Sequence, residues 1–359
     1  MILAVRVYLS TVIKRLIVAP LLYVSLLLTF LLSVGCSSKP DIIEITGSKM
    51  GTTYHITVVA DQIPPQNLAQ QIDDLLAAVD NSMSTYKQNS EISQFNRMQV
   101  GDKLEISKQF ADVIQISRDV WQRSNGAFDP TVGPLVDLWG FGAKVLDLTI
   151  PSDQSIANAL SNTGFEYVQL QDSVLTKTKP VELDLSAVAK GYAVDLVADL
   201  LEMSALPDYL VEVGGEIRVS GLNPQGEPWR VAIEQPQIPS SVNRVLALSD
   251  IAVATSGDYR NYFEQDGVKY SHTIDPRSGK PVTHSLASVT VVTKSCAEAD
   301  AWATAFSVMG ADQSIELADQ MGLPVYLLVR ENQQYASINS AAFKPYLNQP
   351  PNSLIDKEN

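Results

Sequence analysis

The hydrophobic positions of this 359-residue chain follow two different periods. Apolar residues alternate with period two in residues 43–45 and 54–58, on either side of Gly47 and Gly51, which predicts a β-hairpin. Helical spacing predicts helices over 68–79 and 110–121, and we expect two more at 187–203 and 297–309. Further strand-like runs occur at 209–213, 230–234, 245–248, 286–293 and 325–330. Because strands cluster between helices without a regular βαβ rhythm, the pattern favours an α+β fold over a doubly wound parallel sheet.

The N-terminal 35 residues have the pattern of a bacterial export signal. Three basic residues precede an uncharged run at 16–34, and small residues flank Cys36. Residues 32–36 resemble a lipobox, in which the cysteine is acylated and becomes the new N-terminus, although Ser33 stands where Leu, Val or Ile is usual. The apolar run is also long enough for a signal anchor. Either outcome tethers the body outside the cytoplasm.

These patterns predict four parts of the chain. We expect an export signal of lipoprotein type at 1–35, a lipidated N-terminus and linker at 36–48, a folded domain at 49–345 and a polar tail at 346–359. With Cys36 lipidated, Cys296 has no disulfide partner, and we expect it to be a small buried side chain on a helix.

Composition excludes several classes of function. The chain has 26 basic and 40 acidic residues, and cleavage at Cys36 would leave 23 basic residues and a net charge of −17. That balance argues against a nucleic-acid binder with a general basic surface. Three histidines and two cysteines cannot form a zinc framework, and the signatures of P-loop ATPases and α/β-hydrolases do not occur.

Asp184 and Lys190 lie at a predicted junction between a strand and a helix. Such a junction presents unpaired amides, and the positive end of the helix dipole attracts phosphate. Lys190 would add a charge, Asp184 could accept hydrogen bonds from a ring or ribose, and the carbonyl of Ala187 could bind a cation. A capping aspartate followed by a solvated lysine would explain the same pattern.

Asp300 and Thr304 are four residues apart on a predicted helix, so their oxygens share one face. Carboxylate, hydroxyl, carbonyl and phosphate oxygens suit Mg²⁺, which takes only one or two protein carboxylates when a substrate supplies phosphates. The alternative is a threonine bonded to the carbonyl one turn back and an aspartate in the first helical turn.

His272 follows a strand and precedes the turn-forming residues 275–279. A histidine ordinarily titrates near neutral pH, so its neutral form can accept a proton as a general base. A histidine that only orients its own loop would fit the same sequence.

Six segments in this order, behind a lipoprotein-like signal, resemble the ApbE family of FAD:protein FMN transferases. They span most of the body between Met50 and Met309, and they are residues 50–54, 126–132, 184–192, 213–217, 271–279 and 299–305. The resemblance implies an α+β fold of ApbE-like, T-fold-like type, with mixed sheets flanked by helices and an FAD site in a cleft between lobes.

The resemblance also implies a function. Members bind FAD and Mg²⁺, cleave the FAD pyrophosphate and transfer FMN to a threonine or serine hydroxyl of a partner protein, releasing AMP. Their partners are membrane subunits of ion-pumping redox complexes. Two alternatives stay open: an FAD pyrophosphatase that makes free FMN and AMP, and an envelope FAD-binding lipoprotein without turnover.

Site residues carry over position by position. His272 would be the catalytic base, and Cys36 the lipidated residue. The cation would be held by Ala187, Asp300 and Thr304. The FAD site would be lined by Met50, Tyr86, Ala127, Phe128, Asp129, Asp184, Lys190 and Ile274. The family motif commonly ends Arg-Thr-Gly where this chain has Arg-Ser-Gly at 277–279, which keeps the hydroxyl.

The resemblance also places the protein in the cell. We expect a lipid anchor in the cell inner membrane, on the periplasmic side, because the partners lie in that membrane. Ser37 after the cysteine would also permit sorting to the outer membrane.

Overall fold

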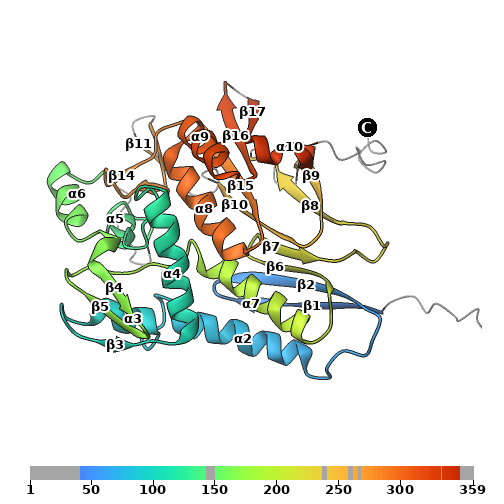
Figure 1. Cartoon of the computed structure of the whole chain (residues 1–359). Coiled ribbons are helices and arrows are strands. Elements are labelled where there is room, and N and C mark those ends of the chain that lie inside the picture. The colour runs from blue at the N-terminus through green and yellow to red at the C-terminus, as the bar shows by residue number, and fades with distance from the viewer. Residues whose placement is uncertain are drawn as a thin grey trace, which may run out of the picture. The chain divides into compact units, whose positions relative to one another are not determined.

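The computed structural model describes residues 41–142, 150–236, 241–257, 262–265, 268–332 and 334–347. Residues 41–359 form a separate compact unit, shown in Figure 1. The expected signal and Cys36 lie outside the described residues. Within them, no helix combines the length and the apolar character needed to cross a membrane.

An eight-stranded antiparallel sheet forms the centre of this unit (Figure 1). Its order is β1-β2-β6-β7-β10-β15-β16-β17. The strands are β1 (Asp41–Lys49), β2 (Thr52–Ala60), β6 (Asp208–Val213), β7 (Glu216–Ser220), β10 (Ile251–Gly257), β15 (Leu286–Thr293), β16 (Val325–Glu331) and β17 (Gln334–Asn339). Each pair of neighbouring strands is antiparallel, so the fold is α+β as expected.

Helices cover one face of this sheet and a hairpin covers the other. The helices on the first face are α2 (Leu68–Met83), α7 (Ala189–Met203), α8 (Cys296–Met309) and α9 (Ala311–Met321). The second face packs against β8 (Trp229–Glu234), β9 (Val242–Leu248) and the C-terminal turns η2 (Ala341–Phe343) and α10 (Lys344–Leu347). The sheet is therefore the middle of three layers, and its strands bury side chains on both faces.

Smaller elements complete the unit beside the helical face. A three-stranded sheet contains β3 (Leu104–Glu105), β4 (Val168–Gln171) and β5 (Val174–Lys177). Around it lie α3 (Glu91–Arg97), α4 (Lys108–Arg123), α5 (Gly133–Leu138), α6 (Asp153–Leu160) and η1 (Phe165–Tyr167). Two short hairpins follow, made by β11 (Tyr262–Gln265) with β12 (Val268–Ser271) and by β13 (Ile274–Asp275) with β14 (Lys280–Pro281).

Most of the elements predicted from the hydrophobic period are present in the structure. The first hairpin is confirmed, with Gly47 opposite Tyr54 and its turn at Met50–Gly51, where φ is 56° and 73°. The helix expected at 297–309 begins one residue earlier, at Cys296, which is buried as expected. These elements have one clear apolar face or a long apolar run, so local sequence was sufficient to locate them.

Three boundaries differ from the expectation. Residues 41–48 belong to β1 rather than to a linker, because β1 pairs with β2 along its whole length. The expected polar tail at 346–359 begins later, since α10 continues to Leu347. The helix expected from residue 187 begins at Ala189.

The strand expected before Asp184 is absent from the described structure. Residues 181–185 form neither a helix nor a strand. The side-chain amide of Asn96 accepts from Leu183 N at 2.7 Å and donates to Leu183 O at 2.9 Å. Asp184 N donates to Pro130 O at 2.7 Å. Side-chain and loop groups thus replace a strand partner here.

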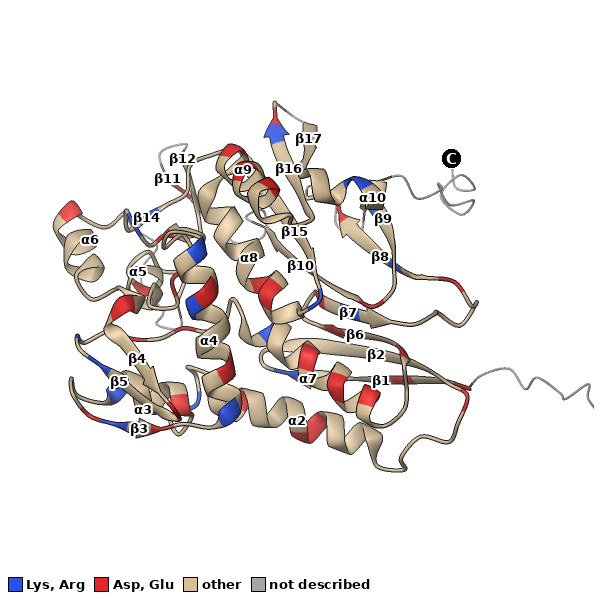
Figure 2. Cartoon of the chain, viewed as in Figure 1, with Lys and Arg blue, Asp and Glu red and all other residues tan. Residues whose placement is uncertain are grey.

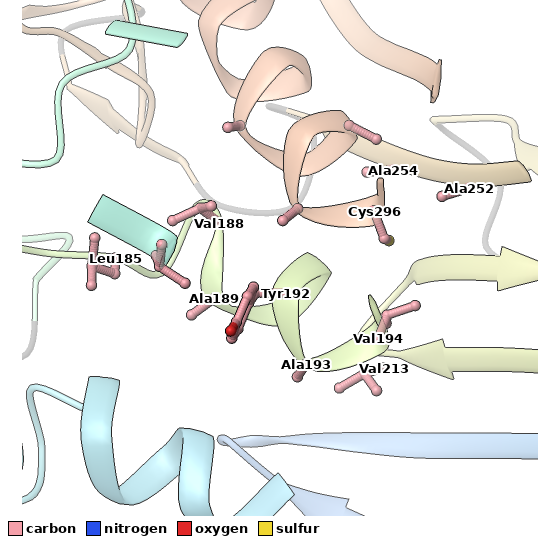
Figure 3. Close-up of a cluster of buried hydrophobic side chains, with 14 of the residues drawn as sticks. Leu185, Val188, Ala189, Tyr192, Ala193, Val194, Val213, Ala252, Ala254 and Cys296 are labelled. Atoms are coloured by element: carbon pink, nitrogen blue, oxygen red, sulfur yellow. The ribbon is translucent and has the colours of Figure 1, made fainter. Parts of the chain in front are cut away.

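Helices α7 and α8 touch through their backbones near the centre of the unit. Figure 3 shows Cys296 at the start of α8 beside the buried side chains of α7, among them Tyr192 and Val194. A Cβ atom on Gly191 would lie 2.3 Å from the Cys296 carbonyl oxygen and 2.8 Å from Ala297 Cα. Glycine is therefore required at position 191 for this close approach.

Replacing Gly191 by alanine should push the two helices apart. The added methyl meets backbone atoms that cannot rotate away, so we expect Gly191→Ala to lower the free energy of unfolding by about 1–3 kcal/mol. Thermal and urea unfolding would measure this loss. Gly133→Ala is the matched control, because its Cβ would meet its nearest neighbour at 3.8 Å. Equal stability of the two variants would contradict the close contact.

Candidate functional site

A cavity of about 1240 Å³ opens between the main sheet and the helices beside it. Its wall combines segments that are distant in sequence. They include the start of β2, the loop before α5, the segment leading into α7, the β6–β7 turn, the end of β10, the loop after β12 and one face of α8. This volume exceeds that of most small-ligand pockets and fits a long ligand such as a dinucleotide.

Lys190, in the first turn of α7, lies between two buried carboxylates on the cavity wall. Its Nζ is 2.8 Å from Oε1 of Glu216 on β7 and 3.8 Å from Oδ2 of Asp300 on α8. Glu216 is 4% exposed and Asp300 is 6% exposed. One ammonium group thus faces two carboxylates at the place where three elements meet.

The charges in this cluster shift one another's pKa. Burial alone would lower the pKa of Lys190, but Asp300 and Glu216 raise it above its ordinary value. Burial, together with repulsion from Asp300, raises the pKa of Glu216 to about 8 against the opposing effect of Lys190. Burial also raises the pKa of Asp300. The fully ionised cluster carries one excess negative charge in a buried wall, so it favours an additional cation.

The carbonyl of Ala187 is available for such a cation. In a regular helix Gly191 N–H would donate to it, but here Gly191 N donates to Asp300 Oδ2 at 3.2 Å. Within the described residues, no hydrogen bond ends on the Ala187 carbonyl oxygen. Ala187, Asp300 and Thr304 all line the cavity. The carbonyl, carboxylate and hydroxyl expected to hold a cation are therefore present on one wall.

The donor set has the chemistry that Mg²⁺ prefers. No group of three or more His, Cys, Asp or Glu residues in the described ranges could hold a metal ion. Mg²⁺ does not require such a group, because it is bound by one or two carboxylates and keeps positions for water and phosphate. Glu216 Oε2 is buried and has no hydrogen-bond partner among the described residues. This unsatisfied acceptor adds to the negative field, so the residues fit a divalent cation.

The loop before α5 forms another part of the wall. Ala127, Phe128 and Asp129 all line the cavity. The Asp129 carboxylate accepts from Thr131 N at 2.7 Å and from Phe165 N at 3.2 Å, and burial raises its pKa. Asp129 therefore fixes the shape of the loop, which leaves the backbone and Phe128 to face a ligand.

Asp184 lines the same part of the cavity. Its Oδ1 accepts from Ser186 N at 2.8 Å, which bends the chain ahead of α7. It does not cap the helix, because the residue before α7 is Val188 and no side chain caps it. The turn leaves Asp184 partly exposed at the cavity, where its other oxygen can meet a ligand.

His272 lies on the wall in the loop between β12 and β13. Its ring meets the edge of Phe141, with centroids 6.3 Å apart and planes at 71°. Phe141 in turn contacts Phe263 of β11, and Phe263 stacks on Tyr270 of β12. Aromatic packing therefore orients the loop that carries His272.

The structure gathers almost all of the predicted site residues at one cavity. Those on the wall are Tyr86, Ala127, Phe128, Asp129, Asp184, Ala187, Lys190, His272, Ile274, Asp300 and Thr304. Met50 does not line the cavity; it occupies the β1–β2 turn and packs partly against the main core. The neighbouring Thr52 and Thr53 line the wall in its place.

Sequence reasoning missed Glu216. The two glycines before it form the β6–β7 turn, with φ values of 65° at Gly214 and 102° at Gly215. Gly214 also packs closely on Lys190, since a Cβ there would lie 3.1 Å from Lys190 Cδ. An acidic residue directly after a glycine pair was the only indication of this role in the sequence. Its partner, Lys190, became evident only from the structure.

Comparisons with known proteins identify relatives of this chain. The sequence model described as the ApbE family matches residues 50–327. An FAD:protein FMN transferase of Vibrio cholerae is 41% identical over 325 residues, which cover 89% of this chain and 97% of that protein. The FAD:protein FMN transferase of Escherichia coli K12 is 37% identical over 339 residues, with 90% and 97% covered.

Solved structures give the same result. The flavin transferase ApbE from Vibrio cholerae has a TM-score of 0.80 at 40% identity, covering 86% of this chain and 99% of that one. The apo form of Pseudomonas stutzeri flavinyl transferase ApbE has a TM-score of 0.82 at 36% identity, covering 88% and 99%.

Removing Lys190 should make stability depend more steeply on pH. A carboxyl group whose pKa is raised by folding stabilises the fold at acid pH, and this contribution is lost as the pH rises through the raised pKa. Without Lys190, the pKa of Glu216 and Asp300 should rise further. We therefore expect metal-free Lys190→Ala to have a lower melting temperature than wild type. The difference in melting temperature should increase between about pH 5 and pH 9.

Melting curves across this pH range would test the expectation. Lys49→Ala is the control, since it removes the same charge from a surface pair with Asp73 at 3.1 Å. If the difference in melting temperature between Lys190→Ala and wild type did not change with pH, the pKa values of the two carboxylates would not depend on this lysine.

Proposed function

The chain belongs to the ApbE family, and on that premise we propose that it transfers FMN from FAD to a threonine or serine hydroxyl of acceptor proteins, releasing AMP. One observation carries the proposal. A single cavity brings Lys190 and the donors Ala187, Asp300 and Thr304 together with His272 on a separate loop. This arrangement provides a site for a pyrophosphate and a base for an incoming hydroxyl.

Mg²⁺ is the cation that we assign to this site. Ala187 O, the Asp300 carboxylate and the Thr304 hydroxyl would hold it, because oxygen donors with few carboxylates suit this ion. When bound, Mg²⁺ would neutralise charge on the FAD pyrophosphate. Lys190 would contribute a second positive charge to the same phosphates.

The transfer exchanges one bond to phosphorus for another. The acceptor hydroxyl oxygen bonds to the phosphorus of the FMN half, and the bond from that phosphorus to the bridging oxygen breaks. AMP leaves with the electron pair of that bond. Such a reaction depends mainly on in-line positioning and charge neutralisation, which a rigid wall of buried groups can provide.

His272 would take the proton of the acceptor hydroxyl. It lines the cavity from a loop separate from the cation donors, so a hydroxyl can approach from that side. Phe141 supports its ring, as the edge contact shows. The fixed ring would lower the cost of orienting the base for each transfer.

The acceptors and the location follow from the same premise. We assign acceptor subunits of membrane redox complexes that carry a threonine or serine flavinylation site. A lipid on Cys36 would hold the enzyme on the periplasmic side of the inner membrane, near such subunits. Anionic lipid would repel the folded domain, because the domain is acidic. Figure 2 shows acidic positions along α2 and α7.

The proposed transfer can be separated from hydrolysis and from simple binding. The purified protein would be incubated with FAD, Mg²⁺ and a fragment of a candidate acceptor subunit. We expect flavin to appear on the fragment, with one AMP released for each flavin attached, as measured by mass spectrometry and chromatography. Free FMN with an unlabelled fragment would indicate a pyrophosphatase, and intact FAD without AMP would indicate a binding protein. Either result would contradict the transferase proposal.

His272→Ala should separate chemistry from binding. The substitution removes the base but leaves Lys190 and the cation donors in place, so FAD affinity should survive. Flavin transfer should fall by about 10²- to 10⁴-fold. Fluorescence quenching would measure FAD affinity, and in-gel flavin fluorescence would measure transfer. His55→Ala is the control, because the His55 side chain is exposed and does not line the cavity. Transfer at the full rate by His272→Ala would remove His272 from the mechanism.

Cys36→Ala should release the protein from its expected anchor. Without the thiol, the lipid cannot be attached, so we expect an uncleaved signal or a soluble body. Cell fractionation and intact-mass measurement would distinguish these forms from the lipidated protein. Cys296→Ala serves as the control for loss of a thiol. A Cys36→Ala protein that is processed normally and stays on the membrane would contradict lipidation at this residue.

A further inference from the structure

Asp195 on α7 is a buried carboxylate that does not line the main cavity. Its side chain accepts four hydrogen bonds from two other elements. The donors are Ser295 Oγ at 2.8 Å, Cys296 N at 2.9 Å, Ala297 N at 3.0 Å and Arg218 Nη1 at 3.0 Å. Asp195 therefore joins α7 to the first turn of α8 and to β7, which carries Arg218.

The contacts between α7 and α8 are reciprocal. Asp195 of α7 accepts backbone N–H groups at the start of α8, while Asp300 of α8 accepts the backbone N–H of Gly191 at the start of α7. Gly191 and Asp195 are four residues apart, as are Cys296 and Asp300, so each pair shares one helix face. Each helix thus places a carboxylate on the other's positive end.

Strand β7 is also held against α7, in this case by ion pairs between side chains. Glu216 and Arg218 are two residues apart and lie on the same face of the strand. Glu216 pairs with Lys190 at 2.8 Å, and Arg218 pairs with Asp195 at 3.0 Å. Glu216 thus holds α7 on β7 beside the cavity, and Arg218, which also contacts Asp199 and Glu202 of α7, holds it further along the helix.

We propose that Asp195 is a positioning residue that sets where α8 lies along α7, and thereby the spacing of the Ala187, Asp300 and Thr304 oxygens that hold the cation. The inference rests on the proposed function, since it takes these three residues as the cation donors. Asp195 acts through the helix backbone and does not touch the cation.

Cation binding should be sensitive to the position of α8, because the distances between the metal and its ligands must be accurate. Mg²⁺ demands near-ideal octahedral geometry with ligands at about 2.0–2.1 Å, whereas one residue along a helix advances by about 1.5 Å. Ala187 precedes α7 and the other two donors lie on α8, so the site spans both helices. A shift of α8 by even a fraction of one residue would separate the donors.

The test measures cation binding without substrate or turnover. Mn²⁺ would be titrated into wild type, Asp195→Asn, Asp199→Asn and Asp300→Ala, and free Mn²⁺ followed by electron paramagnetic resonance. Asp199→Asn is the matched control. It removes the same charge one turn further along α7, where Asp199 contacts Arg218 at 3.4 Å from an exposed position.

We expect Asp195→Asn to weaken Mn²⁺ binding about 10- to 100-fold, the usual effect of losing a residue that orients metal ligands. Asp199→Asn should change it less than about threefold, as expected for an exposed pair. Melting curves without metal provide the second readout. A merely structural role would lower the melting temperature of Asp195→Asn and leave its Mn²⁺ affinity at the wild-type value, which would overturn the inference.

The Asp300→Ala variant distinguishes an error in the role of Asp195 from an error in the proposed cation site. Loss of Mn²⁺ binding in Asp300→Ala but not in Asp195→Asn would overturn the inference alone. Retention of Mn²⁺ binding in Asp300→Ala would overturn the cation site and the inference with it. Should Asp195→Asn not fold, Ser295→Ala removes one donor to the same carboxylate. A loss of about threefold or more would then support the inference, and an unchanged affinity would overturn it.

Discussion

The structure of this site depends on one partly buried ammonium group that is shared by two buried carboxylates. Lys190 lies 2.8 Å from Glu216 and 3.8 Å from Asp300, and neither acid is more than 6% exposed. Burying either carboxylate alone would be costly, and one lysine cannot neutralise both. The remaining negative charge favours a cation beside Asp300. This charge imbalance is the physical basis of the cation that we propose at this site.

The backbone around the cluster is built for close contact. Gly191 lets α7 touch the carbonyl of Cys296, and Gly214 lets the β6–β7 turn pack on the Lys190 side chain. Five alanines along α8 keep that helix narrow, so it is buried on most of its surface. Because the helices are in contact at their backbones, small residues and hydrogen bonds to main-chain groups position the donors. The site is therefore an outcome of packing between three elements, and no single loop contains it.

The sequence predicted those features that depend on residues close to one another along the chain. The hairpin at 41–60 and the long helices followed from apolar period, because each has a distinct buried face. The Asp300 and Thr304 pair followed from helical spacing on one helix. Resemblance to a family then supplied the other site residues, and of the residues it named within the described ranges all except Met50 line the cavity.

The remaining features depend on partners that are distant in sequence. Glu216 pairs with a lysine of the preceding helix, and Asp195 bonds to a helix about one hundred residues later. The expected strand before Asp184 takes its hydrogen bonds from the side chain of Asn96, which local pattern cannot reveal. In each case the fold supplies the partner that determines the role of the residue.

The central claim is that the two helices together form a cation site facing the cavity. Crystals grown with FAD and Mn²⁺ would test it most directly, because Mn²⁺ scatters anomalously and replaces Mg²⁺ at oxygen sites. The account predicts one anomalous peak bonded to Ala187 O, Asp300 and Thr304, with FAD phosphate oxygens completing its coordination. FAD bound in the cavity with no peak between these residues, or a peak elsewhere on the pyrophosphate, would contradict it.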